Sequence, residues 1–292
     1  MKTSKKIITR VLGHLLKKFF PKTVYPNFLF LRTKKNFRKK NNQLKQSIKF
    51  SNNLDEINNH EYKYTSQNNE DGIIEYIFQK IPNNKYFVEI GLGYYEFNSL
   101  NLIKKGWNGK LIDIDDDEII ALKKNLAYFY PKAKIDLINK KITKENINDI
   151  VFSNNFNKKI DFFSIDIDGN DYWALKEMNL SNVNVICCEF NPWIKNEKIA
   201  IKYDENFIFE DNGIYGASLS AYTELLNSKG FSLIAVESSG TNAFFVNNNF
   251  KDKFKILSPI TSYKFAGRFY NSDKKKEIFE NVRKNLDRFT KV

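Results

Sequence analysis

The stretch that decides the fold is YFVEIGLGYYEF, residues 86–97. Its first five residues are typical of a buried strand, and Gly91 and Gly93 follow at the turn into a predicted helix. A dinucleotide-binding turn of this kind needs a third glycine at position 96, where the pyrophosphate meets the helix N-terminus. Glu96 stands there instead, and its carboxylate would repel a phosphate. The turn therefore disfavours NAD and FAD and suits a ligand without phosphate.

Strand-like and helix-like segments alternate on both sides of this turn. Parallel strands joined by crossover helices form a sheet that is covered on both faces. The pattern predicts an α/β fold with a seven-stranded, mostly parallel, doubly wound and Rossmann-like sheet, whose last strand is a hairpin partner. The expected strands are residues 86–90, 110–114, 135–138, 160–167, 185–190, 232–236 and 243–246, and the expected helices are 71–81, 96–105, 118–129, 144–152, 172–178 and 217–228.

The positive charge of the chain is concentrated at its N-terminus. Residues 1–50 contain 15 Lys and Arg and no Asp or Glu, which leaves 32 basic and 34 acidic residues in the rest. Within them, IITRVLGHLLKKFF at 7–20 has apolar side chains at helical spacing but is too short and too charged to span a bilayer. Two interpretations stay open. Either this helix lies on an anionic membrane surface, with RTKKNFRKK at 32–40 as a second basic cluster, or it packs on the domain. Nucleic acid is the less favoured partner.

The chain divides into three expected parts. The polar, Asn-rich stretch at 49–60 is typical of a linker between an arm and a domain. Ser272 or Asp273 is expected to cap a last helix. The parts are a basic amphipathic arm and linker at 1–58, a ligand-binding domain at 59–272, and a C-terminal helix at 273–292.

The spacing of the two cysteines indicates in which cellular compartment the protein occurs. Cys187 and Cys188 are adjacent and point to opposite faces of an expected strand, so no disulfide between them is expected. Nothing in this pattern suggests an oxidising compartment. We therefore expect a cytoplasmic protein, peripheral at the inner membrane if the arm binds lipid. The high Asn, Lys and Ile content is typical of a bacterial protein from an AT-rich genome.

The second expected strand ends in carboxylates. Open α/β sheets bind ligands at the carboxyl ends of their strands. In LIDIDDDEI at residues 111–119, Asp113 closes the strand, where its carboxylate can accept both hydroxyls of a ribose. Asp115 shares the same face, and the alternative for Asp115 and its neighbours is that they cap the next helix.

A second group of acids lies in IDFFSIDIDGNDYW at residues 160–173, where Asp166 and Asp168 stand at the end of an expected buried strand. Buried acids at a carboxyl edge seldom serve packing alone. The following strand, VICCEFNPW, ends in Glu189 and Asn191. Because parallel strands end at the same edge, we expect Asp166, Asp168 and Glu189 to converge in one pocket.

These groups also form a candidate metal site. Asp166, Glu189 and Asn191 would supply only oxygen ligands, which suits Mg²⁺ or Ca²⁺. The favoured interpretation is metal-free, with the same groups binding ligand and substrate directly.

The motifs together resemble those of the FkbM-like methyltransferases, a class I group. That family has an acid-x-Gly turn, then an acid that ends the second strand before a Leu-x-x-Asn helix, then an Asp-x-x-x-Ile-Asp-x-Glu-Gly-x-Glu segment. It also has an upstream Ser-Gln-x-x-Glu-Asp motif. The matching residues here are Glu89 and Gly91; Asp113 and Asn125; Asp161, Asp166, Asp168, Gly169 and Asp171; and Ser66, Gln67, Glu70 and Asp71. The resemblance covers residues 64–247, and YGASLSA and SSGTNAFFV within that range look like segments of a related bacterial branch.

The resemblance implies S-adenosylmethionine as cofactor and O-methylation of a sugar, glycan or small-molecule hydroxyl. The only histidines, His14 and His60, precede the sheet, so a carboxylate would take the acceptor's proton. Asp168 and Asp171 replace longer glutamates of the family, and Tyr95 stands where many class I enzymes have another glycine. The expected catalytic residues are Asp166, Asp168 and Glu189, and the expected cofactor-binding residues are Glu89, Gly91, Gly93, Asp113, Gln67 and Asp166.

Two other functions stay open. Asn191, Pro192 and Trp193 resemble the Asn/Asp-Pro-Pro-aromatic turn of nucleic-acid and protein N-methyltransferases, although the second proline is missing and the turn follows the fifth expected strand. The chain could also be a binding module that kept the fold without the chemistry. Loss of cofactor binding would distinguish that module from both enzymes.

Overall fold

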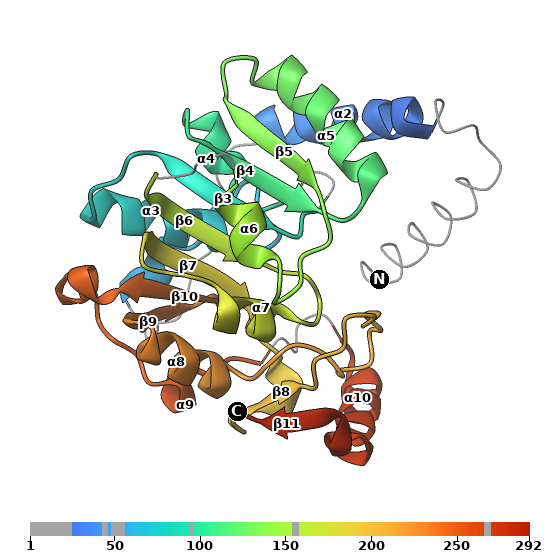
Figure 1. The fold of residues 1–292 in the computed structure, drawn as a ribbon, viewed down its shortest axis with the longest axis vertical. Helices are drawn as coiled ribbons and strands as arrows, with labels where there is room; N and C mark the ends of the chain where they lie inside the picture. Colours follow the sequence, from blue (N-terminus) through green and yellow to red (C-terminus); the bar gives the residue numbers. More distant parts are fainter. Residues whose placement is uncertain (1–24, 43–45, 48–55, 94–95, 154–157, 266–269) are drawn as a thin grey trace.

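The computed structural model describes residues 25–42, 46–47, 56–93, 96–153, 158–265 and 270–292 (Figure 1). Its centre is a seven-stranded sheet in the order β5-β4-β3-β6-β7-β10-β9, parallel except for β10. From β3 the chain winds one way through β4 and β5 and then the other way through β6 and β7, so the winding reverses between β3 and β6. The strands are β3 (Tyr86–Ile90), β4 (Asn108–Asp113), β5 (Ile135–Asn139), β6 (Ile160–Ile165), β7 (Val183–Glu189), β9 (Phe231–Val236) and β10 (Asn242–Asn247).

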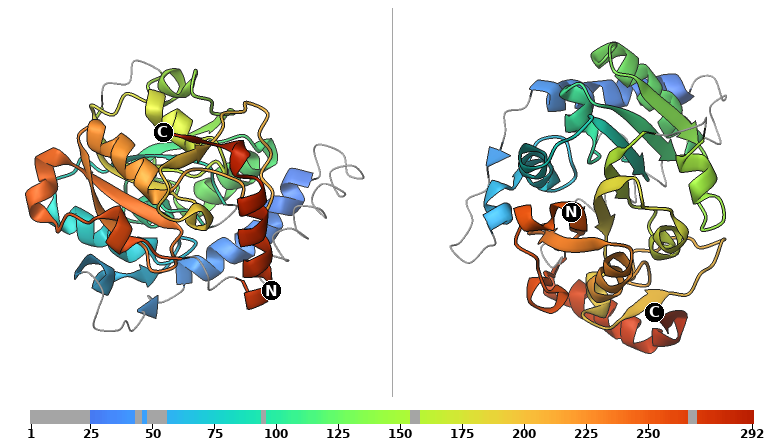
Figure 2. Two further views of the ribbon diagram at one scale, coloured as in Figure 1. Left: turned by 90° about the horizontal axis from the view of Figure 1, so that it is seen from below. Right: turned by 60° about the vertical axis from the view of Figure 1, so that its left-hand side comes forward.

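This sheet confirms the doubly wound fold of class I methyltransferase type predicted from the sequence. The expected hairpin partner, β10, pairs with β9 and is also inserted beside β7. Helices cover both faces (Figure 2). One apolar cluster lies under α3 (Glu70–Lys80), α4 (Leu100–Lys104) and α5 (Asp116–Phe129), and the other lies under α6 (Ile147–Val151), α7 (Asp171–Glu177) and α8 (Leu219–Ser228).

Four elements are shorter than expected, namely α4, α6, α8 and β6. Local structure explains the limits of α4 and β6. Helix α4 begins at Leu100 rather than at residue 96, because the carboxylate of Glu89 accepts the main-chain N–H groups of Asn98 and Ser99 and holds them in a turn. Strand β6 ends at Ile165 because the chain turns through Asp168, which has a left-handed φ of 61°.

The C-terminal region differs from the prediction of a helix over 273–292. Helix α10 (Ser272–Lys284) is capped by Asn271, whose side chain accepts the N–H of Lys274, rather than by Ser272 or Asp273. Beyond it, β11 (Phe289–Lys291) pairs antiparallel with β8 (Ile199–Ile201). Strands of three residues are too short to show a period-two pattern, which is why the sequence did not indicate them. This region packs around its own apolar cluster, which includes Trp193, Ile278 and Val282.

The expected arm lies partly outside the described residues. The amphipathic stretch at 7–20 lies outside the described residues, so its interpretation stays a prediction. Helix α2 (Tyr25–Asn42) packs along α5: the ring of Phe37 is buried and stacks on Phe129 with centroids 5.9 Å apart, and Asn125 Nδ2 donates to Thr33 Oγ1 at 2.7 Å. No helix within the described ranges is long and apolar enough to cross a membrane.

The remaining elements are short. Part of the expected linker is the 3₁₀ helix η1 (Glu56–His60), where the buried Asn58 donates to the carbonyl of Val236 at 2.9 Å. The others are β1 (Gln46–Ser47), β2 (Tyr62–Lys63), η2 (Pro192–Ile194), η3 (Asn248–Lys253), α9 (Pro259–Ser262) and η5 (Leu286–Arg288). The domain boundaries at 58 and 272 stay a prediction.

Candidate functional site

Polar residues form one row across the carboxyl edge of the sheet. Ile90 is in register with Ile112 and Ile165, and Ile165 with Cys188, so the residue that follows each of them falls in the same row. Side chains alternate between the two faces of a strand, so these residues belong to the face covered by α3, α4 and α5. Across the sheet the row reads Asp113, Gly91, Asp166, Glu189 and Asn242, with Asn242 directly opposite Glu189.

Gly91 interrupts this row of side chains at the point where the winding of the sheet reverses. Its φ is 78°, and a Cβ there would lie 1.6 Å from the carbonyl oxygen of Asp166. Gly93 is similarly confined, because a Cβ on it would lie 2.5 Å from the carbonyl oxygen of Glu96. Ligands of open α/β sheets bind in the crevice at the reversal point. The row therefore has carboxylates on both sides of a position that no side chain fills.

Glu89 shapes the turn that follows β3. Its Oε1 accepts the N–H of Asn98 at 2.8 Å, and its Oε2 accepts the N–H and the hydroxyl of Ser99 at 2.7 and 2.5 Å. Burial raises the pKa of Glu89 to about 7, and these hydrogen bonds offset only part of that effect. Its carboxylate is thus used to hold the turn against the strand, and direct contact with a cofactor stays a prediction.

Asp113 faces the same turn from the next strand. Its Oδ2 accepts the N–H of Leu92 at 2.8 Å and its Oδ1 accepts the N–H of Asp115 at 2.7 Å, while burial raises its pKa. Each carboxylate oxygen has a further lone pair for a ligand. The next side chain, Ile114, is 64% exposed and offers an apolar surface beside it. Asp115 caps α5 by accepting the N–H groups of Asp117 and Glu118, so helix capping is the correct interpretation for Asp115.

Three carboxylates converge on the other side of Gly91. Asp166, Asp168 and Glu189 each offer an oxygen within 4.8 Å of the others, as the strand ends predicted. The turn that presents Asp168 is held by Asp171, whose oxygens accept the N–H groups of Ile167 at 2.7 Å and Gly169 at 2.9 Å. Burial raises the pKa of Asp171 to about 6.

Asn191, the third member of the predicted metal set, has other hydrogen-bond partners, and its role as a metal ligand stays a prediction. Its side chain is fully buried, and its Oδ1 accepts the N–H of Trp193 at 2.8 Å. Its Nδ2 donates to the carbonyls of Gly213 and Tyr215 at 2.9 and 2.7 Å. Asn191 therefore fixes the chain after β7, whereas Asp168 lies beside Asp166 and Glu189.

Gln67 is exposed in the loop before α3, close to the glycine turn. Its carbonyl accepts a hydrogen bond from Lys63, and Lys63 Nζ lies 3.5 Å from a carboxylate oxygen of Glu96. The ion pair lowers the negative charge at the turn. Because Lys63 offsets the charge of Glu96, the argument against a pyrophosphate ligand rests mainly on the presence of the Glu96 side chain in place of the third glycine. A contact between Gln67 and a cofactor stays a prediction.

Sequence reasoning missed a buried acid network beside the row. Asn242 Nδ2 donates to Glu70 Oε1 at 2.8 Å, and Asn69 Nδ2 donates to Glu237 Oε1 at 2.7 Å. Burial, and next the charge of Glu237, raise the pKa of Glu70 to about 7. Glu70 belongs to TSQNNED and Asn242 to SSGTNAFFV, so the network joins two segments that resemble the family separately in the sequence. Their sequence separation gives no signal that they touch.

A second missed feature is the segment that covers the acid cluster. A Cβ on Gly169 would lie 2.3 Å from the ring of Phe207, so this ring packs directly on the turn that carries Asp168. Asn170 Nδ2 anchors the same segment by donating to the carbonyl of Asp204 at 2.8 Å. The phenol of Tyr215 has its pKa raised, first by burial and then by the nearby carboxylates, Glu189 foremost. The cluster thus lies between strand ends and an aromatic cover.

No family model matches the chain, and no curated protein matches it, so the resemblance to the FkbM-like family stays a prediction. Among solved structures, an S-adenosylmethionine-dependent methyltransferase from Clostridium acetobutylicum ATCC 824 is 12% identical, with 61% of this chain and 90% of that chain covered and a TM-score of 0.41. Magnesium protoporphyrin IX methyltransferase from Synechocystis PCC 6803 with bound SAM is 11% identical, with 61% and 77% covered and a TM-score of 0.42. The N-terminal domain of EvdMO1 with SAH bound is 9% identical, with 74% and 94% covered and a TM-score of 0.42. The conclusions below rest on the strand order and the edge residues.

Proposed function

We propose that the chain is an S-adenosylmethionine-dependent methyltransferase that methylates a hydroxyl group. The observation that carries this is the turn at Gly91, where main chain alone separates Asp113 from the three-carboxylate cluster at the reversal point of the sheet. S-adenosylmethionine is a nucleoside with a sulfonium and no phosphate, so it needs a ribose acceptor and negative charge rather than an anion-binding turn.

The residues present fit that cofactor. Asp113 is held by two main-chain amides and can accept both ribose hydroxyls, and Ile114 can cover a face of the adenine. Gly91 packs directly on the carbonyl of Asp166, so main chain rather than a side chain would face the part of the cofactor that links ribose and methionine. When bound, the cofactor supplies an electrophilic methyl group on a positively charged sulphur.

The acid cluster is assigned to the acceptor. Asp166, Asp168 and Glu189 can accept hydrogen bonds from an acceptor hydroxyl and take its proton, which makes its oxygen a better nucleophile. Transfer of a methyl group otherwise depends mainly on in-line positioning of the two reactants. The rings of Phe207 and Tyr215, which lie beside the cluster, would line part of the acceptor site.

The same three carboxylates would suit Mg²⁺ or Ca²⁺, because all their ligand atoms are oxygens. The metal-free interpretation stays the favoured one. A metal would bind and orient the acceptor oxygen at Asp166, Asp168 and Glu189, so it would not be needed at Asp113. Removal of divalent cations with EDTA is therefore expected to leave both cofactor binding and methyl transfer intact.

A sugar or a glycan is the proposed acceptor class, with another small-molecule hydroxyl as the alternative, and the cytoplasm is the proposed location. No observation favours the N-methyltransferase alternative. The Asn191-Pro192-Trp193 turn follows β7, the fifth strand of the main sheet along the chain, and the buried side chain of Asn191 is hydrogen-bonded to main-chain groups. The non-catalytic alternative is left to experiment.

A transfer assay tests the proposal. The full chain is incubated with methyl-labelled S-adenosylmethionine and a panel of sugars and nucleotide-sugars, with and without EDTA. Label that appears in an alkali-stable methyl ether supports O-methylation. Label on amino groups supports the N-methyltransferase alternative, and the absence of transfer together with the absence of S-adenosylhomocysteine binding in calorimetry supports the binding module.

A further inference from the structure

Helix α2 has two different faces. At about 100° per residue, Thr33 and Phe37 lie on one side, where both are buried against α5. The opposite side carries Leu31, Lys35, Arg38 and Lys39, which are all exposed, and Leu31 is 66% exposed. The inward face explains why the helix is fixed on the domain, but nothing in the described part of the chain covers the outward face.

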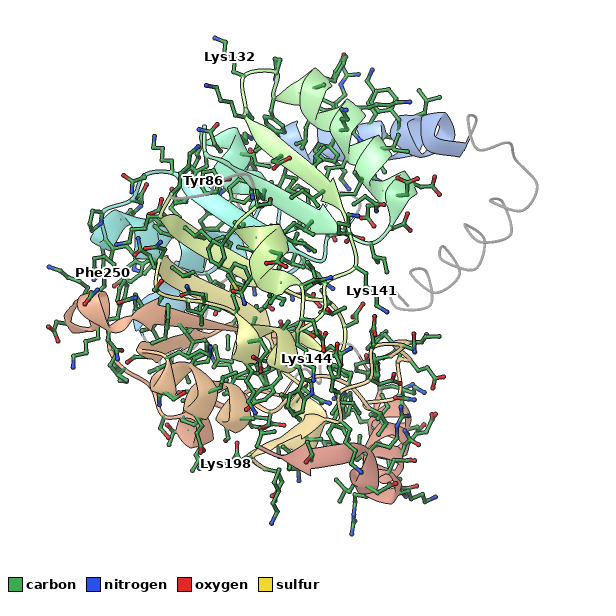
Figure 3. All side chains as sticks on the ribbon, in the orientation of Figure 1. Tyr86, Lys132, Lys141, Lys144, Lys198 and Phe250 are labelled. Carbon is green, nitrogen blue, oxygen red and sulfur yellow. The ribbon has the colours of Figure 1, made fainter. Side chains whose placement is uncertain are left out.

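The outward face is strongly cationic. The sequence of α2 contains six Lys and Arg and no Asp or Glu. Lys34 Nζ lies 3.9 Å from the ring centroid of Tyr128 on α5, so this ring borders the cations of α2. The exposed Lys132 projects from the same end of the molecule, just beyond α5 (Figure 3).

Apolar side chains lie among these cations. Leu31 is 66% and Tyr128 is 60% exposed, which makes them two of the most exposed large apolar residues in the described chain. Cations with interspersed aliphatic and aromatic side chains suit the boundary between anionic headgroups and acyl chains. A nucleic-acid backbone would use the cations but would leave Leu31 without a partner.

We propose that this surface, defined as Leu31, Lys35, Arg38 and Lys39 of α2 with Tyr128 of α5, docks the folded domain on an anionic lipid bilayer. The sequence suggested a detached basic arm, whereas here the binding surface is a rigid part of the domain. Attachment would therefore fix the orientation of the sheet and does not depend on the methyltransferase proposal.

The orientation follows from the strand order. Helix α2 lies at the β5 end of the sheet, with β8 and β11 at the other end (Figure 1). Neighbouring strands are about 4.8 Å apart, so β7 lies about 14 Å farther from the bilayer than β4. Asp113 would be on the lipid-proximal half of the edge, and Glu189 on the distal half, away from the lipid surface.

Vesicle sedimentation of the full chain tests the proposal. Large vesicles of phosphatidylcholine with 30% phosphatidylglycerol are compared with pure phosphatidylcholine at about 0.15 M salt. The variant K35E/R38E/K39E is compared with K251E/K253E/K276E, which makes the same charge change at exposed lysines of η3 and α10. At ~1 kcal/mol per cation near the surface, the α2 variant should bind anionic vesicles roughly 100-fold more weakly, and the control should bind nearly as well as the wild type.

Folding and the alternative partner are checked in the same variants. Both must keep the far-ultraviolet circular dichroism of the wild type, and K35Q/R38Q/K39Q replaces the α2 variant if it does not. Equal binding by wild type and α2 variant would overturn the proposal and assign any attachment to other residues. Equal weakening by the control, or binding to a 20-base-pair DNA duplex with none to anionic vesicles, would overturn it as well.

Discussion

The two halves of the carboxyl edge use their acids differently. On the β3–β4 half, Glu89 and Asp113 are each held by main-chain amides of an adjacent turn. On the β6–β7 half, Asp166, Asp168 and Glu189 come from two strands and face one another within 4.8 Å. The first arrangement builds a fixed cradle, whereas the second concentrates negative charge at one point. The comparison is consistent with the proposal that one half binds the cofactor and the other performs the chemistry.

The largest effect is expected from Gly91→Ala, which attacks the junction of the two halves. The new methyl group would overlap the carbonyl of Asp166, so we expect cofactor binding to be lost and the melting temperature to fall. The control is Gly106→Ala, because Gly106 has a similar φ of 81° but nothing within 4 Å of a Cβ. If both variants bind S-adenosylhomocysteine equally in calorimetry, the turn at Gly91 has no role in binding.

Asp113→Ala tests the β3–β4 half of the edge through its affinity for S-adenosylhomocysteine. Loss of a pair of charge-assisted hydrogen bonds to ribose should weaken binding of S-adenosylhomocysteine by roughly 2–4 kcal/mol. Asp115→Ala removes a carboxylate two residues away that caps α5, so it should cost about 1 kcal/mol of stability and leave affinity unchanged. Unchanged affinity in Asp113→Ala would remove Asp113 from the cofactor site.

Glu189→Gln should show the opposite separation. The amide cannot take the acceptor's proton, so the transfer rate should fall by roughly 100-fold while affinity for S-adenosylhomocysteine stays the same. Glu197→Gln, at an exposed position after the same strand, serves as the control and should change neither. A parallel loss of affinity in Glu189→Gln would mean that the two halves form one binding site without division of roles.

The smallest effect concerns the pH dependence of the cradle without cofactor. The pKa of buried Glu89 is about 7, above its ordinary value of 4.5, so the fold favours the protonated acid. Its contribution is therefore complete below about pH 4.5 and is lost as pH rises through 7. Between pH 5.5 and 8 this should lower stability by roughly 2 kcal/mol, and Glu89→Gln should lack that part of the slope. Identical slopes in urea unfolding would contradict it, since the other titrating acids, Glu70 included, are present in both proteins.

The sequence predicted what is local and missed what depends on packing. Gly91 and Asp113 could be identified because a turn and a strand end are each encoded within a few residues. The convergence of Asp166, Asp168 and Glu189 followed from parallel strands ending at one edge. The buried contacts of Asn191 with Gly213 and Tyr215 could not be predicted, because the partners lie more than twenty residues away in the sequence.

Longer-range features gave no readable signal. The contact between Glu70 and Asn242 joins residues 172 apart, and the docking of α2 on α5 joins Thr33 to Asn125 across 92 residues. The basic composition of α2 concealed the fact that one face is apolar enough to pack. Contacts of this kind depend on register and burial, which a single sequence does not specify.

Ligand selectivity of the full chain is the most direct test of the central claim. Isothermal titration calorimetry is carried out with S-adenosylhomocysteine and, separately, with NAD⁺, both in the presence of EDTA. The structure predicts saturable one-to-one binding of S-adenosylhomocysteine and no binding of NAD⁺. The edge of the sheet offers Asp113 for the ribose and a cluster of carboxylates, but it lacks the third glycine of a pyrophosphate-binding turn. Binding of NAD⁺, or the absence of binding by S-adenosylhomocysteine, would contradict the account.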